Sequence, residues 1–123
     1  MKLLVVGGTG AFGSFYASLF KKNGFDVYIS STDPQKGKAF CEKNCYGYAS
    51  DAEIKSMDIV LISAPNVVAP KLVKLFAPKM KKGSLLMDFC SVKGEVVEAL
   101  NEFTDKGLEI LSKRTDTIFQ PSN

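Results

Sequence analysis

The sequence predicts an α/β fold in which a mainly parallel sheet is covered on both faces by helices, in a doubly wound arrangement. Short apolar runs alternate along the chain with amphipathic helical segments. The apolar runs are hydrophobic at nearly every position, which is typical of parallel strands buried on both faces. A length of 123 residues corresponds to a single domain.

The first two elements are a strand and a helix. Residues 3–6 are all apolar, and the run stops at Gly7. The following apolar residues recur at helical spacing: Phe12, Phe15, Tyr16, Leu19 and Phe20. We expect Phe12, Phe15 and Phe20 to belong to the core. Gly24 suits the left-handed position that ends many helices.

The next segment contains two strands and two helix starts. Residues 25–29 predict the second strand. Asp33 is a typical N-cap, and Pro34 fits the first position of the helix that follows. Residues 46–49 predict a third, short strand. Residues 50–53 match a capping box, with serine followed three positions later by glutamate, and predict one or two helical turns.

The middle of the chain contains the clearest strand. Residues 58–63 predict a buried strand, and residues 85–89 predict another. Between them we expect a helix that begins at Asn66, a good N-cap. Its predicted apolar face consists of Val68, Leu72, Leu75 and Phe76.

The last elements are a helix over residues 92–104 and a strand over residues 108–111. We therefore expect one dinucleotide-binding domain over residues 1–112. The remaining residues, 113–123, form a polar tail without a pattern, which we interpret as loosely attached or as the start of a further domain.

Composition excludes several classes of protein. The net charge of +3 is small and spread along the chain, so it does not indicate a nucleic-acid partner. No segment reaches the roughly 20 apolar residues of a membrane span, and we expect a cytoplasmic protein. With three cysteines, no CxxC spacing and no histidine, the sequence predicts no metal site.

A glycine-rich motif follows the first strand and opens the first helix, and this context predicts dinucleotide binding by a Rossmann-type domain. The motif has the pattern G-x-G-x-x-G and consists of Gly8, Thr9, Gly10, Ala11, Phe12 and Gly13. Its first glycine permits a tight turn, the second lets a pyrophosphate approach, and the third lets the helix pack closely on the sheet. The pyrophosphate would lie at the helix N-terminus, which favours anions.

The tip of the second strand favours NADP, although NAD also fits. Ser31 and Thr32 are small and uncharged, so they would not repel a 2′-phosphate. Lys36 and Lys38 are near enough in sequence to pair with one. Asp33 lies close to the usual position of the acidic residue that binds the ribose of NAD, but it is also the predicted N-cap.

The loop after the fourth strand is the other predicted contact with the cofactor. In a doubly wound sheet, the carboxyl ends of the strands line the ligand crevice. The residues of this loop are Ser63, Ala64, Pro65 and Asn66. A purely structural interpretation also exists, in which Pro65 ends the strand and Asn66 caps the helix.

The fifth predicted strand runs into a D-x-x-S-V-K turn, from Asp88 to Lys93. Together with the glycine motif, this turn resembles the nucleotide-binding domain of prephenate dehydrogenases. The resemblance implies oxidative decarboxylation of prephenate or arogenate with NAD(P), a step of tyrosine biosynthesis. It places Ser91 beside the nicotinamide and the substrate ring, with Lys93 close by. Without the resemblance, Ser91 is a helix N-cap and Lys93 a solvated surface charge.

The sequence also departs from that family. Prephenate dehydrogenases carry a His-Pro motif after the next strand, whereas this chain has Ser112 and Lys113 there and no histidine. The helical domain that gives the family its dimer interface and an arginine for the substrate carboxylate is also missing. We therefore expect a cofactor-binding half, or a natural single-domain relative, with little dehydrogenase activity alone. A small carboxylate substrate would bind only with the missing domain.

Two other functions fit the same glycine motif. One is an NADP-dependent reductase of another Rossmann family, acting on a deazaflavin cofactor. The other is a non-catalytic module that senses dinucleotides. Activity without any histidine would favour the reductase, and a gene that stops at residue 123 would favour the module.

Overall fold

The computed structural model describes residues 1–7, 10–64, 68–88 and 109–112. Within them lies one parallel sheet of six strands in the order β3-β2-β1-β4-β5-β6. The strands are β1 (Lys2–Val6), β2 (Asp26–Ser30), β3 (Gly47–Tyr48), β4 (Ile59–Ile62), β5 (Leu85–Asp88) and β6 (Glu109–Ser112). The predicted doubly wound α/β fold of the Rossmann type is thereby confirmed.

The strands end together at one edge of the sheet. Val6 of β1 is in register with Ser30 of β2 and with Ile62 of β4, and Ile62 is in register with Asp88 of β5. The chain leaves β1 in one direction toward β2 and later returns on its other side as β4. The strand order therefore reverses between β1 and β4, and this is where doubly wound sheets bind their ligands.

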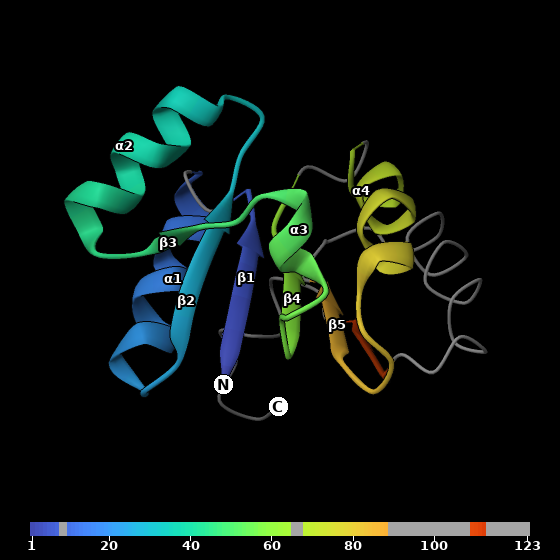
Figure 1. The fold of residues 1–123 in the computed structure, drawn as a ribbon. Coiled ribbons are helices and arrows are strands. Elements are labelled where there is room, and N and C mark those ends of the chain that lie inside the picture. Colours follow the sequence, from blue (N-terminus) through green and yellow to red (C-terminus); the bar gives the residue numbers. More distant parts are fainter. Residues whose placement is uncertain (8–9, 65–67, 89–108, 113–123) are drawn as a thin grey trace.

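Helices cover both faces of this sheet, as Figure 1 shows with α1 behind it and α3 and α4 in front. The helices are α1 (Ala11–Lys22), α2 (Pro34–Asn44), α3 (Asp51–Ile54), α4 (Ala69–Phe76) and the 3-10 helix η1 (Ala77–Lys79). Tyr16 of α1 and Cys41 of α2 pack against Leu3 and Val5 of β1. On the opposite face, α3, α4 and η1 pack against alternate strand residues, including Leu4. Because both faces are covered, the strands are apolar throughout.

The end of α1 follows the prediction for Gly24. Its φ of +89° is left-handed, and its N–H donates to the Lys21 carbonyl at 3.2 Å. The next N–H, of Phe25, donates to the Phe20 carbonyl at 3.1 Å. These two bonds form a Schellman motif, which satisfies the last carbonyls of the helix and turns the chain into β2.

The aromatic residues of α1 do not all belong to the core, so that prediction was partly wrong. Phe12 and Phe15 are 52% and 48% exposed, whereas Phe20 is half-buried against the core. The buried residues of α1 are Gly13, Tyr16 and Ala17. Because two of these are small, the helix approaches the sheet closely, and the large neighbouring rings lie on its flanks.

The helix predicted from Asn66 begins later and buries a different face. It begins at Ala69 with Val68 as N-cap, and a proline lies in its first turn, where the missing N–H costs nothing. Val68 and Leu75, which were predicted to belong to the apolar face of this helix, are 39% and 51% exposed. The buried side of α4 comprises Ala69, Pro70, Val73 and Phe76.

The capping box predicted at residues 50–53 differs from the bonds in the structure. Ser50 is the N-cap of α3, but its hydroxyl donates to the Glu53 carboxylate at 2.6 Å, so the expected reciprocal backbone bonds of a capping box do not form. The helix predicted over residues 92–104 lies outside the described residues.

At the opposite edge of the sheet, Asp58 links the starts of two strands. One carboxylate oxygen accepts from the Lys2 backbone N–H at 2.9 Å, and the other pairs with the Lys81 ammonium at 2.8 Å. The hydrogen bond from Lys81 and then that from Lys2 lower the pKa of Asp58. A lowered pKa contributes stability above about pH 4, the pKa of an unfolded aspartate, and loses it as pH falls through the folded value.

We expect Asp58→Asn to lower the urea midpoint at neutral pH and to flatten its fall in acid. The measurement is urea unfolding at a series of pH values from neutral to acidic. Lys81→Met is the matched control, because it removes the main partner of the same carboxylate. The double variant is expected to lose less than the sum of the two single losses, and additive losses would contradict the coupling.

Candidate functional site

A cavity of about 560 Å³ opens at the carboxyl edge of the sheet, where the strand order reverses. It lies over the ends of β1, β2 and β4, between the start of α1 and the side of α4. Its lining consists of Val6, Gly7, Gly10, Ser30, Ser31, Thr32, Asp51, Ser63, Ala64, Val68, Leu72, Leu75 and Phe76. Five of the predicted cofactor-binding residues line it: Gly10, Ser31, Thr32, Ser63 and Ala64.

Gly7 brings the ends of β1 and β4 into contact at the floor of this cavity. Its φ is +84°, and a Cβ built on it would lie 2.1 Å from the Ser63 carbonyl oxygen. The Gly7 N–H donates to the Ser30 carbonyl at 3.0 Å, and the Ser63 N–H donates to the Val6 carbonyl at 2.9 Å. The end of the first strand at Gly7 was predictable from the sequence, but this role of Gly7 was not, because the contact joins residues far apart in sequence.

The N-terminus of α1 borders the cavity. Gly10 is its N-cap, with its N–H donating to the Gly7 carbonyl at 3.1 Å. Among the described residues, a Cβ on Gly10 would meet only that carbonyl oxygen, at 3.4 Å, so the position lies beside open space. The first N–H groups of an α-helix have no acceptor within the helix, and together with the helix dipole they favour an anion.

The other residues of the glycine motif have different positions. Ala11 and Phe12 begin α1 and are exposed. Gly13 is buried, consistent with its predicted role in close packing of helix and sheet. Gly8 and Thr9 lie outside the described residues.

The tip of β2 presents hydroxyl groups and no charge to the cavity. Thr32 lines the cavity, and so does Ser31, whose hydroxyl donates to the Asp33 carbonyl at 2.8 Å. The Asp33 carboxylate accepts from the N–H groups of Gln35 and Lys36, at 3.1 and 3.3 Å. Asp33 is thus the N-cap of α2, as predicted, and it lies outside the cavity lining.

One wall of the cavity is apolar and comes from α4. Val68, Leu72 and Leu75 lie along one side of this helix and line the cavity. From the sequence, these residues were predicted only as part of an apolar helix face, without a role at a ligand site. Periodicity shows that one side of a helix is apolar, but does not distinguish a core from a ligand surface. The signal for a ligand surface was the place of this helix in the chain, because it directly follows the strand at the switch point of the sheet.

The cavity contains one acidic residue among its described lining residues. Asp51, at the start of α3, is 82% exposed and pairs with the Lys79 ammonium at 3.1 Å. This pairing offsets its negative charge. The remaining predicted site residues, Pro65, Asn66, Ser91 and Lys93, lie outside the described residues.

Comparison with known proteins identifies the family. The family model described as the nucleotide-binding domain of prephenate dehydrogenase matches residues 16–112. The chain belongs to this family. It is therefore an NAD(P)-binding domain of the dehydrogenase type, which agrees with the resemblance carried by the D-x-x-S-V-K turn.

Relatives with similar sequences or structures are longer than this chain. A probable arogenate/prephenate dehydrogenase of Methanocaldococcus jannaschii is 29% identical over 99% of this chain, which spans 27% of that protein. Arogenate dehydrogenase of Synechocystis has a TM-score of 0.75 at 18% identity, over 84% of this chain and 37% of that one. Prephenate dehydrogenase of Aquifex aeolicus, in complex with hydroxyphenyl propionate and NAD⁺, has a TM-score of 0.72 at 22% identity, over 88% and 40%.

At these identities, the likeness to the two solved structures shows the fold. No helix among the described residues is long and apolar enough to span a membrane.

Proposed function

We propose that this chain binds the cofactor for an enzyme that oxidatively decarboxylates prephenate or arogenate, and that it prefers NADP to NAD. The family match supports the reaction, and the uncharged tip of β2 at the cavity is the observation that supports the cofactor preference. The dinucleotide supplies the hydride acceptor, and the protein orients it.

The geometry of the cavity fits the adenosine half of such a cofactor. The N-terminus of α1 would hold the pyrophosphate, because Gly10 leaves room beside the first-turn N–H groups. The apolar wall formed by Val68, Leu72 and Leu75 would pack against the flat adenine ring. Ser31 and Thr32 would face the ribose.

NADP preference follows from the missing acidic residue at the β2 tip. In NAD-binding domains, a carboxylate there bonds the ribose hydroxyls and would repel a 2′-phosphate. Here Asp33 is engaged as the N-cap of α2. Isothermal titration of the chain with NADP⁺ and with NAD⁺ is expected to give at least about tenfold tighter binding of NADP⁺, a difference of about 1.4 kcal/mol.

Equal affinities for NADP⁺ and NAD⁺ would contradict the cofactor preference but would not contradict the dinucleotide site. Absence of binding by either cofactor would contradict the site itself. In the same samples, prephenate or arogenate is expected to cause little or no reduction of the nicotinamide, because the chain has no histidine for the substrate hydroxyl. Rapid reduction would contradict this part of the proposal.

The remaining predicted residues belong to the nicotinamide half of the proposal. Pro65 and Asn66 follow the cavity residue Ala64 along the chain, and Ser91 and Lys93 follow β5, which ends at the same edge of the sheet. The family resemblance supports a position for Ser91 and Lys93 beside the nicotinamide and the substrate. A cytoplasmic location and dimerisation through a further domain are part of the same proposal.

A further inference from the structure

We propose that Lys38 binds the 2′-phosphate of NADP and is the residue that sets the cofactor preference. This inference rests on the proposed function and goes one step further, because it distinguishes between two lysines of α2 that are close in sequence to the β2 tip.

A second cavity, of about 680 Å³, adjoins the first. The two cavities share Ser30, Ser31 and Asp51 in their linings. A ribose at the tip of β2 would therefore have its 2′ position close to the junction between them. Pro34 and Lys38, one helical turn apart on α2, line the second cavity.

Gly37 holds this part of α2 against the β2 tip. A Cβ on Gly37 would lie 2.3 Å from the Ser31 hydroxyl oxygen and 2.4 Å from the Tyr48 ring. The backbone of α2 thus touches Ser31 at the position that precedes Lys38. Lys38 follows Gly37 directly and lines the same cavity as Ser31, so this cation of α2 lies close to the β2 tip.

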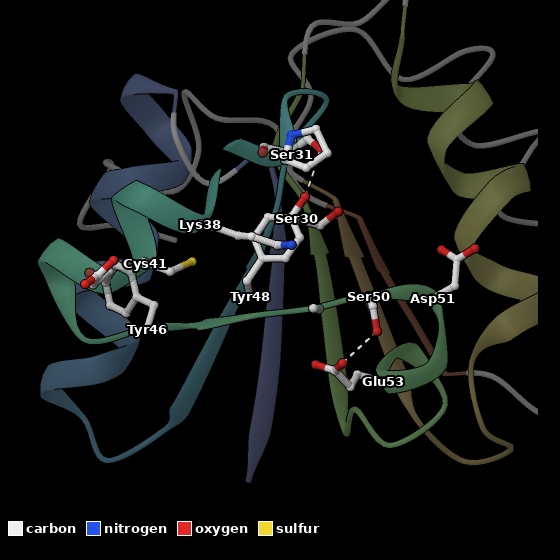
Figure 2. Close-up of a pocket in the computed structure, with 12 residues that line it drawn as sticks. Ser30, Ser31, Lys38, Cys41, Tyr46, Tyr48, Ser50, Asp51 and Glu53 are labelled. Carbon is white, nitrogen blue, oxygen red and sulfur yellow. Dashed lines mark hydrogen bonds between the residues drawn. The ribbon is translucent and has the colours of Figure 1, made fainter. Parts of the chain in front are cut away.

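Tyr48 positions the ammonium group of Lys38. The Lys38 nitrogen lies 5.7 Å from the centre of the Tyr48 ring, and Figure 2 shows the lysine extending from α2 across that ring. The Tyr48 hydroxyl donates to the Ser31 carbonyl at 3.5 Å, which ties the ring to the β2 tip. The ring attracts a cation over its face without neutralising the charge, so the ammonium group can still pair with an anion.

The acidic groups around this cavity do not cancel that charge. In the described part of the chain, no carboxylate forms an ion pair with Lys38. Asp51 pairs with Lys79. Glu53 accepts a hydrogen bond from the Ser50 hydroxyl, which is drawn as a dashed line in Figure 2. Glu42 is one helical turn after Lys38 and lines the same cavity, but among the described residues the two form no ion pair.

Lys36 provides the matched control. It is exposed, lies two residues from Lys38, and lines neither cavity. Residues two apart on a helix point to different sides, so Lys36 does not face the junction. Replacing either lysine by glutamine removes the same charge from the same helix.

The test is titration of the wild type and of the Lys38→Gln and Lys36→Gln variants with four ligands: NADP⁺, NAD⁺, adenosine 2′,5′-bisphosphate and 5′-AMP. We expect Lys38→Gln to weaken binding of NADP⁺ and the bisphosphate about tenfold, the effect of one hydrogen bond to a charged group. Binding of NAD⁺ and 5′-AMP is expected to stay unchanged. Lys36→Gln is expected to change none of the four affinities, and Lys38→Arg to retain the preference.

The outcomes separate this inference from the proposed function. If the wild type prefers NADP⁺ and Lys38→Gln keeps that preference, the role of Lys38 is wrong and the proposed function stands. An equal loss of affinity for NAD⁺ and NADP⁺ would also overturn the role of Lys38, because only NADP⁺ carries the 2′-phosphate that Lys38 is proposed to bind. If the wild type binds none of the four ligands, both the inference and the proposed function fail.

Discussion

Gly10→Val is expected to reduce dinucleotide affinity about a hundredfold or more while leaving the fold intact. The valine side chain would fill the space beside the N-terminus of α1 and keep the pyrophosphate from the first-turn N–H groups. Loss of two hydrogen bonds to a charged group, each contributing about 1.5–3 kcal/mol, corresponds to that factor. Titration of the variant with NADP⁺ measures the effect.

The backbone at this position tolerates a side chain, which makes the variant informative. Gly10 has φ −76° and ψ 175°, an extended conformation open to any residue, and in the described part of the chain a Cβ would meet only one atom, at 3.4 Å. Urea unfolding should therefore give a midpoint close to that of the wild type. A folded Gly10→Val variant with unchanged affinity would show that the pyrophosphate does not bind at this helix.

The sheet was predictable from the sequence because its strands are buried on both faces. A run such as the one in β4, apolar at all four positions, has few alternatives. The helices were less predictable. An apolar stripe on a helix shows that the side is covered by something, and the sequence does not show whether the cover is the core, as for Val73, or a ligand cavity, as for Leu75.

The same limit applies to the candidate site. Gly10, Ser31 and Ser63 were predicted as site residues from local patterns, namely a glycine motif and the ends of strands, and all three line the cavity. Gly7 was missed, because its need for glycine arises from a carbonyl that lies far away in the sequence. Lys36 and Lys38 were equivalent in sequence, and the register of α2 against Ser31 and Tyr48 distinguishes them.

Gly7→Ala is expected to destabilise the protein by about 3 kcal/mol or more. An alanine at a left-handed φ costs about 1–2 kcal/mol, and forcing a methyl group into a packed site adds about 1–3 kcal/mol. The added Cβ would lie 2.1 Å from the Ser63 carbonyl oxygen, which belongs to the backbone, so relief requires β1 and β4 to separate. The free energy of unfolding in urea measures the loss.

Gly24→Ala is the matched control, because it isolates the conformational part of this cost. Gly24 has nearly the same φ, +89° against +84°, but no atom of the described residues lies within 4 Å of its Cβ position. The free energy of unfolding of this variant should fall by only about 1–2 kcal/mol, the cost of the left-handed conformation alone. Because β1 and β4 also form the floor of the cavity, Gly7→Ala should weaken NADP⁺ binding, whereas Gly24→Ala should not. Equal losses of stability in the two variants would show that the contact between Gly7 and Ser63 is not what demands glycine at the switch point.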